Sequence, residues 1–355
     1  YDNGVVMDMR NDNSLPKIER IPVDSPKIGD ILGFGGYPRG KIIEIFGPES
    51  GGKTSFATYL AGICQNTTFL DEDEKTGEVT ERKGTVLFID AENSFDFEYA
   101  EVHKFKKKQC ILVQPDNGEQ ALDIALQMIE TGAVDMIIID SIASLTPIAE
   151  IEADMDQQQM GLQARLISKF LRKATALLNQ TKTTLVCINQ IRDKIGGFSR
   201  PGITATDTPG GKALKFYSSI RIEVKRREYL MDKDTTIGIA IAMKSVKNKT
   251  APPMRKQLIE MYFDKGFDAH LEWISFAIEY DVIQNPNQGS YLTLEGKKIR
   301  GKQNVIDYYS DEANAEEYKK VIEMTKERMY ANVRGRVSAD DPDDEKEINE
   351  LIDEE

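Results

Sequence analysis

The sequence predicts an α/β protein: a core with a mainly parallel twisted sheet and helices on both faces, followed by a small C-terminal α/β domain. Three observations predict this fold. Apolar strands alternate with amphipathic helices from Gly40 to about Ala251, a glycine-rich phosphate-binding motif joins the first strand of that region to its first helix, and the pattern changes from about His270. Such alternation is typical of a parallel sheet, because each parallel connection has to cross a face of the sheet.

The predicted strands of the core are short apolar runs rich in β-branched side chains. They span residues 41–46, 85–90, 110–113, 136–140, 184–189, 218–225 and 237–246. One charged interruption, Asp71 to Lys83, contains Thr76-Gly77 and predicts a solvent-exposed hairpin inserted into the core.

Residues 1–30 are polar, and three prolines within them break any long helix. We expect a lead-in outside the core, in which only Val5-Val6-Met7 forms a short strand. The core domain is then expected to span residues 31–268.

After the core, residues 269–335 predict the small C-terminal domain, with a helix at 271–280, a hairpin at 291–299 and a charged helix at 313–328. Residues 336–355 predict a disordered acidic tail. The net charge of the whole chain is −13, and −9 of it lies in residues 339–355, so a basic surface elsewhere remains compatible with the composition.

No run of 18 or more apolar residues occurs, and the first residues do not resemble a signal peptide, so we expect no membrane contact and a cytoplasmic location. The three cysteines, Cys64, Cys110 and Cys187, stand singly in apolar contexts, which argues against disulfides and against a metal centre.

The most specific motif is the stretch GPESGGKT at residues 47–54, which fits the spacing G-x-x-x-x-G-K-[ST] between a strand and a helix. Its glycines allow backbone N–H groups and the helix N-terminus to face a phosphate. Lys53 would reach the β- and γ-phosphates, and Thr54 would offer a hydroxyl to Mg²⁺. The predicted nucleotide-binding residues are Gly47, Pro48, Glu49, Ser50, Gly51, Gly52, Lys53 and Thr54.

Two predicted strands end in carboxylates, where ligands of open α/β sheets bind. Asp140 follows four apolar residues and would hold Mg²⁺, and Glu92 follows the strand at 85–90 and could polarise a water that attacks the γ-phosphate. The alternative for each is an ordinary helix N-cap just past a strand.

A stretch of about 20 residues between Gln190 and Lys212 shows neither helical nor strand periodicity and is rich in Gly and Thr. Its basic residues and Phe198 suit a loop that orders on single-stranded nucleic acid, with a plain solvated loop as the alternative. Three lysines at 244–249 can be read as a solvated turn at a strand end.

Taken together, these residues resemble the RecA-type strand-exchange recombinases over residues 17–330. The resemblance rests on seven motifs in order and at similar spacing: GPESGGKT at 47–54, FIDAEN at 88–93, IIIDS at 137–141, MGLQAR at 160–165, INQIRDKIG at 188–196, GGKALKFY at 210–217 and VKNK at 246–249.

The resemblance implies a RecA-type P-loop ATPase core and a DNA-dependent ATPase of DNA recombination and repair. Such a protein forms a homo-oligomeric helical filament on single-stranded DNA with ATP and Mg²⁺, and pairs that strand with homologous double-stranded DNA. Loader or mediator proteins and single-strand-binding proteins are possible partners. The place of action would be the bacterial cytosol and nucleoid, or the host cytoplasm for a phage protein.

At matching positions the resemblance implies that Glu92 is the catalytic base, that Thr54 and Asp140 hold the metal, and that Asp96 and Tyr99 hold the adenine. The resemblance also implies that Lys53 binds the phosphates and that Gln190 senses the γ-phosphate. Lys247 and Lys249 would act on the ATP of a neighbouring subunit.

The implied DNA loops are residues 154–160 and 192–209. The implied DNA-binding residues are Met160, Gly161, Arg165, Arg172, Arg192, Lys194, Gly196, Phe198, Gly210, Gly211 and Lys212.

The chain departs from the family pattern in four places, which suggest a phage or divergent member. The second loop is longer, the first loop is acidic and rich in glutamine, and residues 71–83 have no counterpart. The family also places a helix before the amino-terminal strand that packs on the next subunit. No such helix precedes Val5-Val6-Met7, which implies a shortened chain or altered filament assembly.

Two alternatives share the predicted nucleotide site. A ring helicase on the same core would carry an arginine finger where Lys247 and Lys249 stand, and needs no paired DNA loops. A non-catalytic DNA-binding mediator would use ATP only as a structural ligand, and Glu92 argues against it because such a protein is expected to lack the base.

Overall fold

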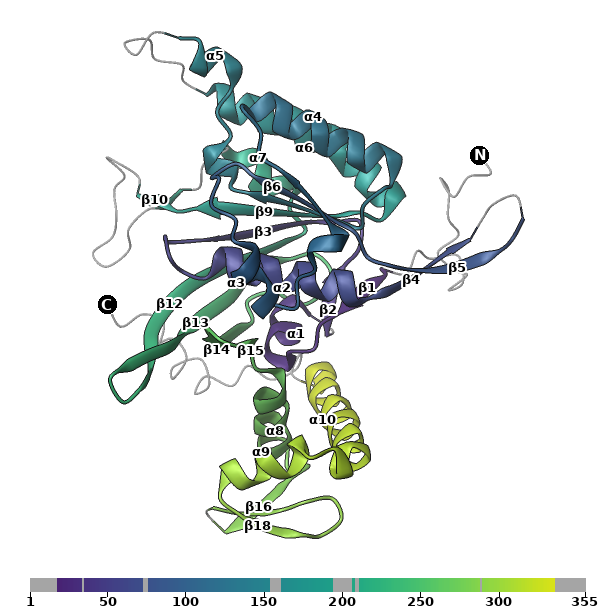
Figure 1. Cartoon of the computed structure of the whole chain (residues 1–355), viewed down its shortest axis with the longest axis vertical. Coiled ribbons are helices and arrows are strands. Elements are labelled where there is room, and N and C mark those ends of the chain that lie inside the picture. The colour runs from purple at the N-terminus through teal and green to yellow at the C-terminus, as the bar shows by residue number, and fades with distance from the viewer. Residues whose placement is uncertain are drawn as a thin grey trace.

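The centre of the protein is a twisted sheet with helices on both faces (Figure 1). The computed structural model describes residues 18–335 except 34, 73–75, 154–160, 194–205, 208–210 and 288. Within those residues nine strands form the central sheet, in the order β15 (Gly266–Phe267), β14 (Lys256–Tyr262), β13 (Thr235–Asn248), β12 (Ile220–Asp232), β3 (Ile42–Gly47), β9 (Thr184–Gln190), β8 (Met136–Asp140), β6 (Val86–Asp90) and β7 (Cys110–Val113).

The half of the sheet from β12 to β7 is parallel, whereas β12, β13, β14 and β15 pair antiparallel. All seven predicted strands are confirmed. The predictions for β12 and β13 were too short: these strands continue past the sheet as a long hairpin that projects from the body in Figure 1.

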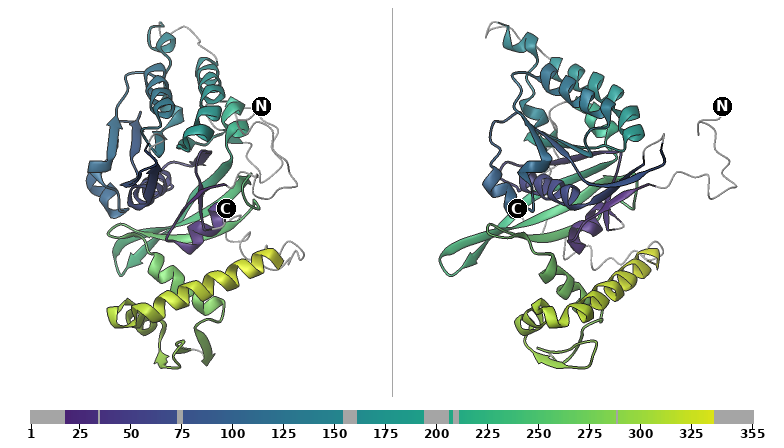
Figure 2. Two further views of the ribbon diagram at one scale, coloured as in Figure 1. Left: turned by 90° about the vertical axis from the view of Figure 1, so that its right-hand side faces the viewer. Right: turned by 45° about the vertical axis from the view of Figure 1, so that its right-hand side comes forward.

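Alternate residues of the parallel strands enter two separate hydrophobic clusters, one on each face of the sheet. In β8, Met136 and Ile138 face the cluster with helix α2 (Lys53–Asn66), while Ile137 and Ile139 face the cluster with α4 (Gly118–Thr131) and α6 (Leu162–Thr181). This period of two fits a strand buried on both faces. The two helical layers are visible in Figure 2.

The segment before residue 31 contributes to the core, so its prediction as a lead-in outside the core is wrong for residues 20–30. Strand β1 (Arg20–Pro22) pairs with β2 (Gly36–Pro38), and α1 (Pro26–Leu32) buries Ile28 and Ile31 completely. Pro26 does not prevent this helix, because it occupies the first turn, where no intrahelical hydrogen bond is lost. Val5-Val6-Met7 lies outside the described residues.

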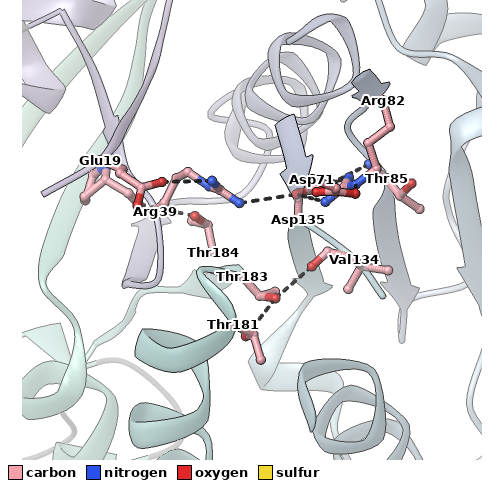
Figure 3. Close-up of polar contacts among 11 residues, drawn as sticks. Glu19, Arg39, Asp71, Arg82, Thr85, Val134, Asp135, Thr181, Thr183 and Thr184 are labelled. Atoms are coloured by element: carbon pink, nitrogen blue, oxygen red, sulfur yellow. Dashed lines mark hydrogen bonds and ion pairs between the residues drawn. The ribbon is translucent and has the colours of Figure 1, made fainter. Parts of the chain in front are cut away.

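The predicted hairpin insertion is confirmed as β4 (Thr68–Glu72) paired antiparallel with β5 (Val79–Lys83). Arg82 anchors it by donating to both carboxylate oxygens of Asp135, at 2.5 and 3.1 Å, and Arg39 approaches the same carboxylate at 3.5 Å (Figure 3). The ring of Phe69 lies within 4.6 Å of the Arg39 guanidinium and 5.3 Å of that of Arg82. The base of the hairpin is therefore held by charge pairing and aromatic packing.

Further helices connect or flank the sheet: α3 (Phe97–Val102), α5 (Ile148–Ile151) and α7 (Gly211–Tyr217). Among its described residues, the predicted structureless loop before α7 contains a pair of short strands, β10 (Arg192–Asp193) and β11 (Thr206–Asp207), which run antiparallel. The absence of strands in that loop was therefore wrongly predicted. Turns at Lys107–Gln109, Ile142–Ser144 and Glu312–Asn314 are 3-10 helices.

The C-terminal residues form their own hydrophobic cluster around Ile274, Tyr291 and Val321. The cluster is enclosed by α8 (Ala269–Glu279), β16 (Gln284–Asn287), β17 (Ser290–Leu292), β18 (Lys298–Arg300), α9 (Lys302–Ser310) and α10 (Ala315–Gly335). The predicted helices and hairpin of this region are confirmed, and α9 is an addition. The predicted tail, 336–355, lies outside the described residues.

In the part of the chain that the structure describes, no helix is both long and apolar enough to cross a lipid bilayer. Cys64, Cys110 and Cys187 are free thiols in the structure.

Candidate functional site

The phosphate-binding motif forms a loop between β3 and α2, and two of its glycines are required by close contacts. A Cβ on Gly47 would lie 2.0 Å from the carbonyl oxygen of Val224. Gly52 has φ of +89°, and a Cβ there would lie 2.6 Å from Cδ1 of Ile241. A larger residue at either position would push the loop away from β12 and β13.

Helix α2 begins at Lys53, and its N-cap, Gly52, has no side chain to satisfy the first N–H groups. These groups and the helix dipole favour an anion. The Lys53 ammonium lies beside them and donates to the carbonyl of Pro48 at 2.5 Å. Burial lowers the pKa of Lys53, while Asp140, Glu92 and Glu49 act in the opposite direction.

Thr54 and Asp140 meet at the end of β8: Oγ1 of Thr54 donates to Oδ2 of Asp140 at 2.7 Å. Only 4% of Asp140 is exposed, and this burial raises its pKa to about 6, with Glu92 and Asp90 acting in the same direction. A cation bound here would stabilise the ionised carboxylate and so offset the free-energy cost of burying its charge.

Glu92 lies across the site just past β6, and its Oε1 accepts three hydrogen bonds. The donors are Oγ of Ser141 at 2.6 Å, Oγ of Ser144 at 3.2 Å and Nε2 of Gln190 at 3.3 Å. The carboxylate is thus oriented by groups at the ends of β8 and β9. The simple N-cap alternative does not hold for Glu92, because helix α3 is capped by Asp96 instead.

One cavity of about 470 Å³ unites most of the predicted nucleotide site. The predicted residues that line it are Glu49, Ser50, Gly51, Gly52, Lys53, Thr54, Glu92, Tyr99, Asp140 and Gln190. Gly47 and Pro48 belong to the phosphate-binding loop but do not line the cavity. Asp96 does not line the cavity: its Oδ1 accepts from the N–H groups of Glu98 and Tyr99, at 2.8 and 3.3 Å.

The cavity wall also contains residues that the sequence did not indicate: Ser55, Ser141, Ile188, Arg226, Tyr229, Ile239, Met261 and Phe263. Ser141 follows Asp140 directly and could have been identified from its position at a strand end. Arg226 and Tyr229 could not, because a bulge between Arg226 and Glu228 in β12 changes which side chains share a face.

Lys247 and Lys249 do not line the nucleotide cavity of their own chain. Lys247 belongs to β13 rather than to a solvated turn, whereas Lys249 directly follows that strand and is exposed. Nζ of Lys247 donates to the carbonyls of Lys215 and Phe216, at 2.6 and 3.1 Å. Nζ of Lys249 lies 3.5 Å from the same Phe216 carbonyl. Burial lowers the pKa of Lys247, and the neighbouring Lys249 adds to this effect. Both lysines therefore stand at the C-terminal end of α7.

Four of the predicted DNA-binding residues lie together in a second hollow of about 380 Å³ between α6 and α7: Arg165, Arg172, Gly211 and Lys212. We call this the basic hollow. Gly161 is exposed at the N-terminus of α6. Met160, Lys194, Gly196, Phe198 and Gly210 lie outside the described residues, and of Arg192 only the backbone, in β10, is described.

Among the described residues no group of three or more His, Cys, Asp or Glu side chains could hold a metal by itself. The Thr54 hydroxyl and the Asp140 carboxylate nevertheless fit Mg²⁺, which binds proteins through one or two oxygen ligands and completes its shell with water and substrate phosphates.

Residues 1–268 match the family model of the RecA N-terminal domain. The chain is similar to Protein RecA of Borrelia duttonii, with 44% identity over 305 residues that cover 84% of this chain and 78% of the relative. It is also similar to Protein RecA of Fusobacterium nucleatum, with 43% identity covering 86% of this chain and 75% of the relative. For Protein RecA of Lactobacillus acidophilus the identity is 37%, covering 100% of this chain and 92% of the relative.

The fold, the site and these similarities agree. The chain belongs to the RecA family of strand-exchange recombinases, whose function is ATP-dependent homologous recombination.

Proposed function

We propose that this recombinase hydrolyses ATP while bound to single-stranded DNA, as a helical filament in which each ATP lies between two subunits. One observation carries the proposal: a single cavity contains the phosphate-binding loop, the Thr54–Asp140 pair, Glu92 and Gln190. Those groups can bind a triphosphate, hold a metal, activate a water and contact the γ-phosphate.

Within the cavity, Lys53 and the first N–H groups of α2 neutralise the phosphates. Thr54 and Asp140 are the proposed ligands of Mg²⁺, which when bound supplies positive charge to the phosphate oxygens. Glu92 accepts a proton from the attacking water, and its hydrogen bonds from Ser141 and Ser144 fix the direction of the carboxylate. Tyr99 and Asp96 are the proposed adenine contacts, and of these only Tyr99 lines the cavity.

Lys247 and Lys249 are proposed to act on the ATP of the neighbouring subunit. Their position outside their own chain's cavity supports this role. The carbonyls that Lys247 contacts end helix α7, which follows the second DNA loop directly, so a DNA-induced shift of α7 would move the lysine.

The basic hollow is the proposed path of single-stranded DNA. Arg165, Arg172 and Lys212 offer three cations there, and Gly211 allows the backbone to approach a phosphate. The residues 154–160 and 192–209 are proposed to complete this surface.

We further propose that the protein acts in the cytoplasm of a bacterium, or of the host if it comes from a phage, together with loader and single-strand-binding proteins. Membership of the family favours a recombinase over a ring helicase or a non-catalytic mediator.

Electron microscopy of the full chain with ATP and single-stranded DNA tests the proposal. We expect continuous helical filaments and ATP hydrolysis that depends on DNA. Closed rings would support the helicase alternative, and DNA binding without any hydrolysis would support the mediator.

A further inference from the structure

Two of the three groups that donate hydrogen bonds to Glu92, Ser141 and Ser144, belong to a short turn between β8 and α5. Ser141 is the N-cap of the 3-10 helix Ile142–Ser144, but its side chain makes no capping hydrogen bond. Its hydroxyl donates instead to Oε1 of Glu92 at 2.6 Å. The position of the carboxylate therefore depends on the position of this turn.

Ser144, at the end of the same turn, completes the cluster. Its Oγ lies 3.2 Å from Oε1 of Glu92 and 3.1 Å from Oγ of Ser141. An ionised carboxylate only accepts hydrogen bonds, so each serine can contribute one proton, either to Glu92 or to the other hydroxyl. Any movement of the turn changes both contacts at once.

Gln163 of α6 holds this turn from the other side. Its Nε2 lies within hydrogen-bond distance of three backbone carbonyl oxygens of the turn: those of Ile142 at 3.2 Å, Ala143 at 3.1 Å and Leu145 at 3.0 Å. An amide has two N–H donors, so the three carbonyls share them. One side chain thus binds nearly the whole backbone of the turn to the first turn of α6.

The first turn of α6 also carries Arg165 into the basic hollow. Two residues along an α-helix turn the side chain by about 200°, so Gln163 faces the turn while Arg165 faces the hollow. Gln163 and Arg165 lie two and four residues after Gly161, the N-cap of α6, where the proposed first DNA loop joins the helix.

We propose that Gln163 is a positioning residue that couples DNA binding at the start of α6 to the orientation of Glu92, through the turn 142–145 and the Ser141–Ser144 pair. The coupling rests on the proposed role of Glu92 as base. It differs from the link through Gln190, which leads from Glu92 to the second loop and does not involve α6.

The test uses the full chain with three variants. Gln163→Met keeps the length of the side chain and removes the donors, and Gln163→Glu places a carboxylate against the carbonyls. Gln180→Met, exposed near the end of α6, is the matched control. With saturating single-stranded DNA we expect Gln163→Met to lower kcat by about 3- to 30-fold, and Gln163→Glu to lower it further.

In the same variants the KM for ATP and the affinity for single-stranded DNA, measured by fluorescence anisotropy, should stay within about twofold of the unmodified chain. A loss of DNA affinity that accounts for the whole loss of turnover would overturn the coupling, and so would an unchanged kcat in Gln163→Glu.

Double-mutant cycles decide whether Gln163 acts through the base. The effect of Gln163→Met should disappear when Glu92→Gln or Ser144→Ala is already present. Equal fold-losses in the presence and absence of these changes would overturn the inference while leaving the proposed function intact. Unchanged turnover in Glu92→Gln alone would instead overturn the role of Glu92, and with it this coupling.

Discussion

Gln190 donates a hydrogen bond from Nε2 to Oε1 of Glu92 at 3.3 Å, although 98 residues separate them in the chain. Gln190 ends β9 and Glu92 follows β6, and β8 lies between these two strands. The proposed γ-phosphate sensor and the proposed base are therefore in direct contact. If the amide turns to a bound γ-phosphate, Glu92 keeps the hydrogen bonds from Ser141 and Ser144.

Glu92→Gln should reduce DNA-dependent ATP turnover by about 100- to 10,000-fold, because the amide cannot accept a proton from water. Binding of ATP and of DNA should remain, since Gln has nearly the same shape. Phosphate release measures turnover, and a fluorescent nucleotide measures affinity. Glu130→Gln on the exposed face of α4 is the control. Unchanged turnover in Glu92→Gln would contradict the assignment.

Asp140→Asn should stabilise the nucleotide-free protein at pH 7.5 while abolishing turnover with Mg²⁺ and ATP. The folded-state pKa of about 6 lies above the ordinary value, so the folded protein binds the proton more tightly than the unfolded chain. Protonation of Asp140 thus adds to the free energy of unfolding. The whole of this contribution is present below about pH 4, and it is lost as the carboxyl ionises while the pH rises through 6.

Asparagine removes the buried charge, so the expected gain at pH 7.5 is about 2 to 3 kcal/mol in the free energy of unfolding, shrinking towards zero at about pH 4. Urea unfolding without nucleotide at several pH values measures it. Asp123→Asn, exposed on α4, should change stability little at any pH. A destabilised Asp140→Asn at pH 7.5 would contradict the argument.

Lys247→Ala and Lys53→Ala should each abolish ATP turnover alone and partly restore it when mixed. At a mixed interface, the intact phosphate-binding loop of one variant meets the intact lysine of the other. Random assembly at equal amounts leaves about one quarter of the interfaces complete. Turnover measured across mixing ratios should peak near equal amounts. If turnover stays absent at every ratio, Lys247 acts within its own chain.

Arg165→Ala and Lys212→Ala should weaken binding of single-stranded DNA and reduce its dependence on salt. Each removed phosphate contact should lower the slope of log affinity against log salt by about 0.7. Lys173→Ala is the control, because Lys173 is exposed on the same helix but does not line the basic hollow. Equal slopes for all three variants would show that the hollow makes no special contribution.

Much of this protein could be predicted from local patterns in its sequence. The positions of the loop at 47–54, of Glu92 just after β6 and of Asp140 at the end of β8 follow from one physical rule: in a parallel sheet, the carboxyl ends of the strands meet at one edge. Glu49 to Thr54, Glu92 and Asp140 accordingly line the same cavity. The hairpin insertion was also predictable, because a charged stretch with Thr76-Gly77 cannot enter an apolar sheet.

The class of fold, the phosphate-binding loop and the carboxylates Glu92 and Asp140 could therefore be read from local patterns, because each pattern depends on residues close together in the chain. Only the tertiary structure placed Gln163 on the turn that orients Glu92, Lys247 on the end of α7, and Arg226 and Tyr229 in the cavity wall. These placements depend on strand order, a β-bulge and helix packing, which join residues distant in the chain and leave no periodic signal in the sequence.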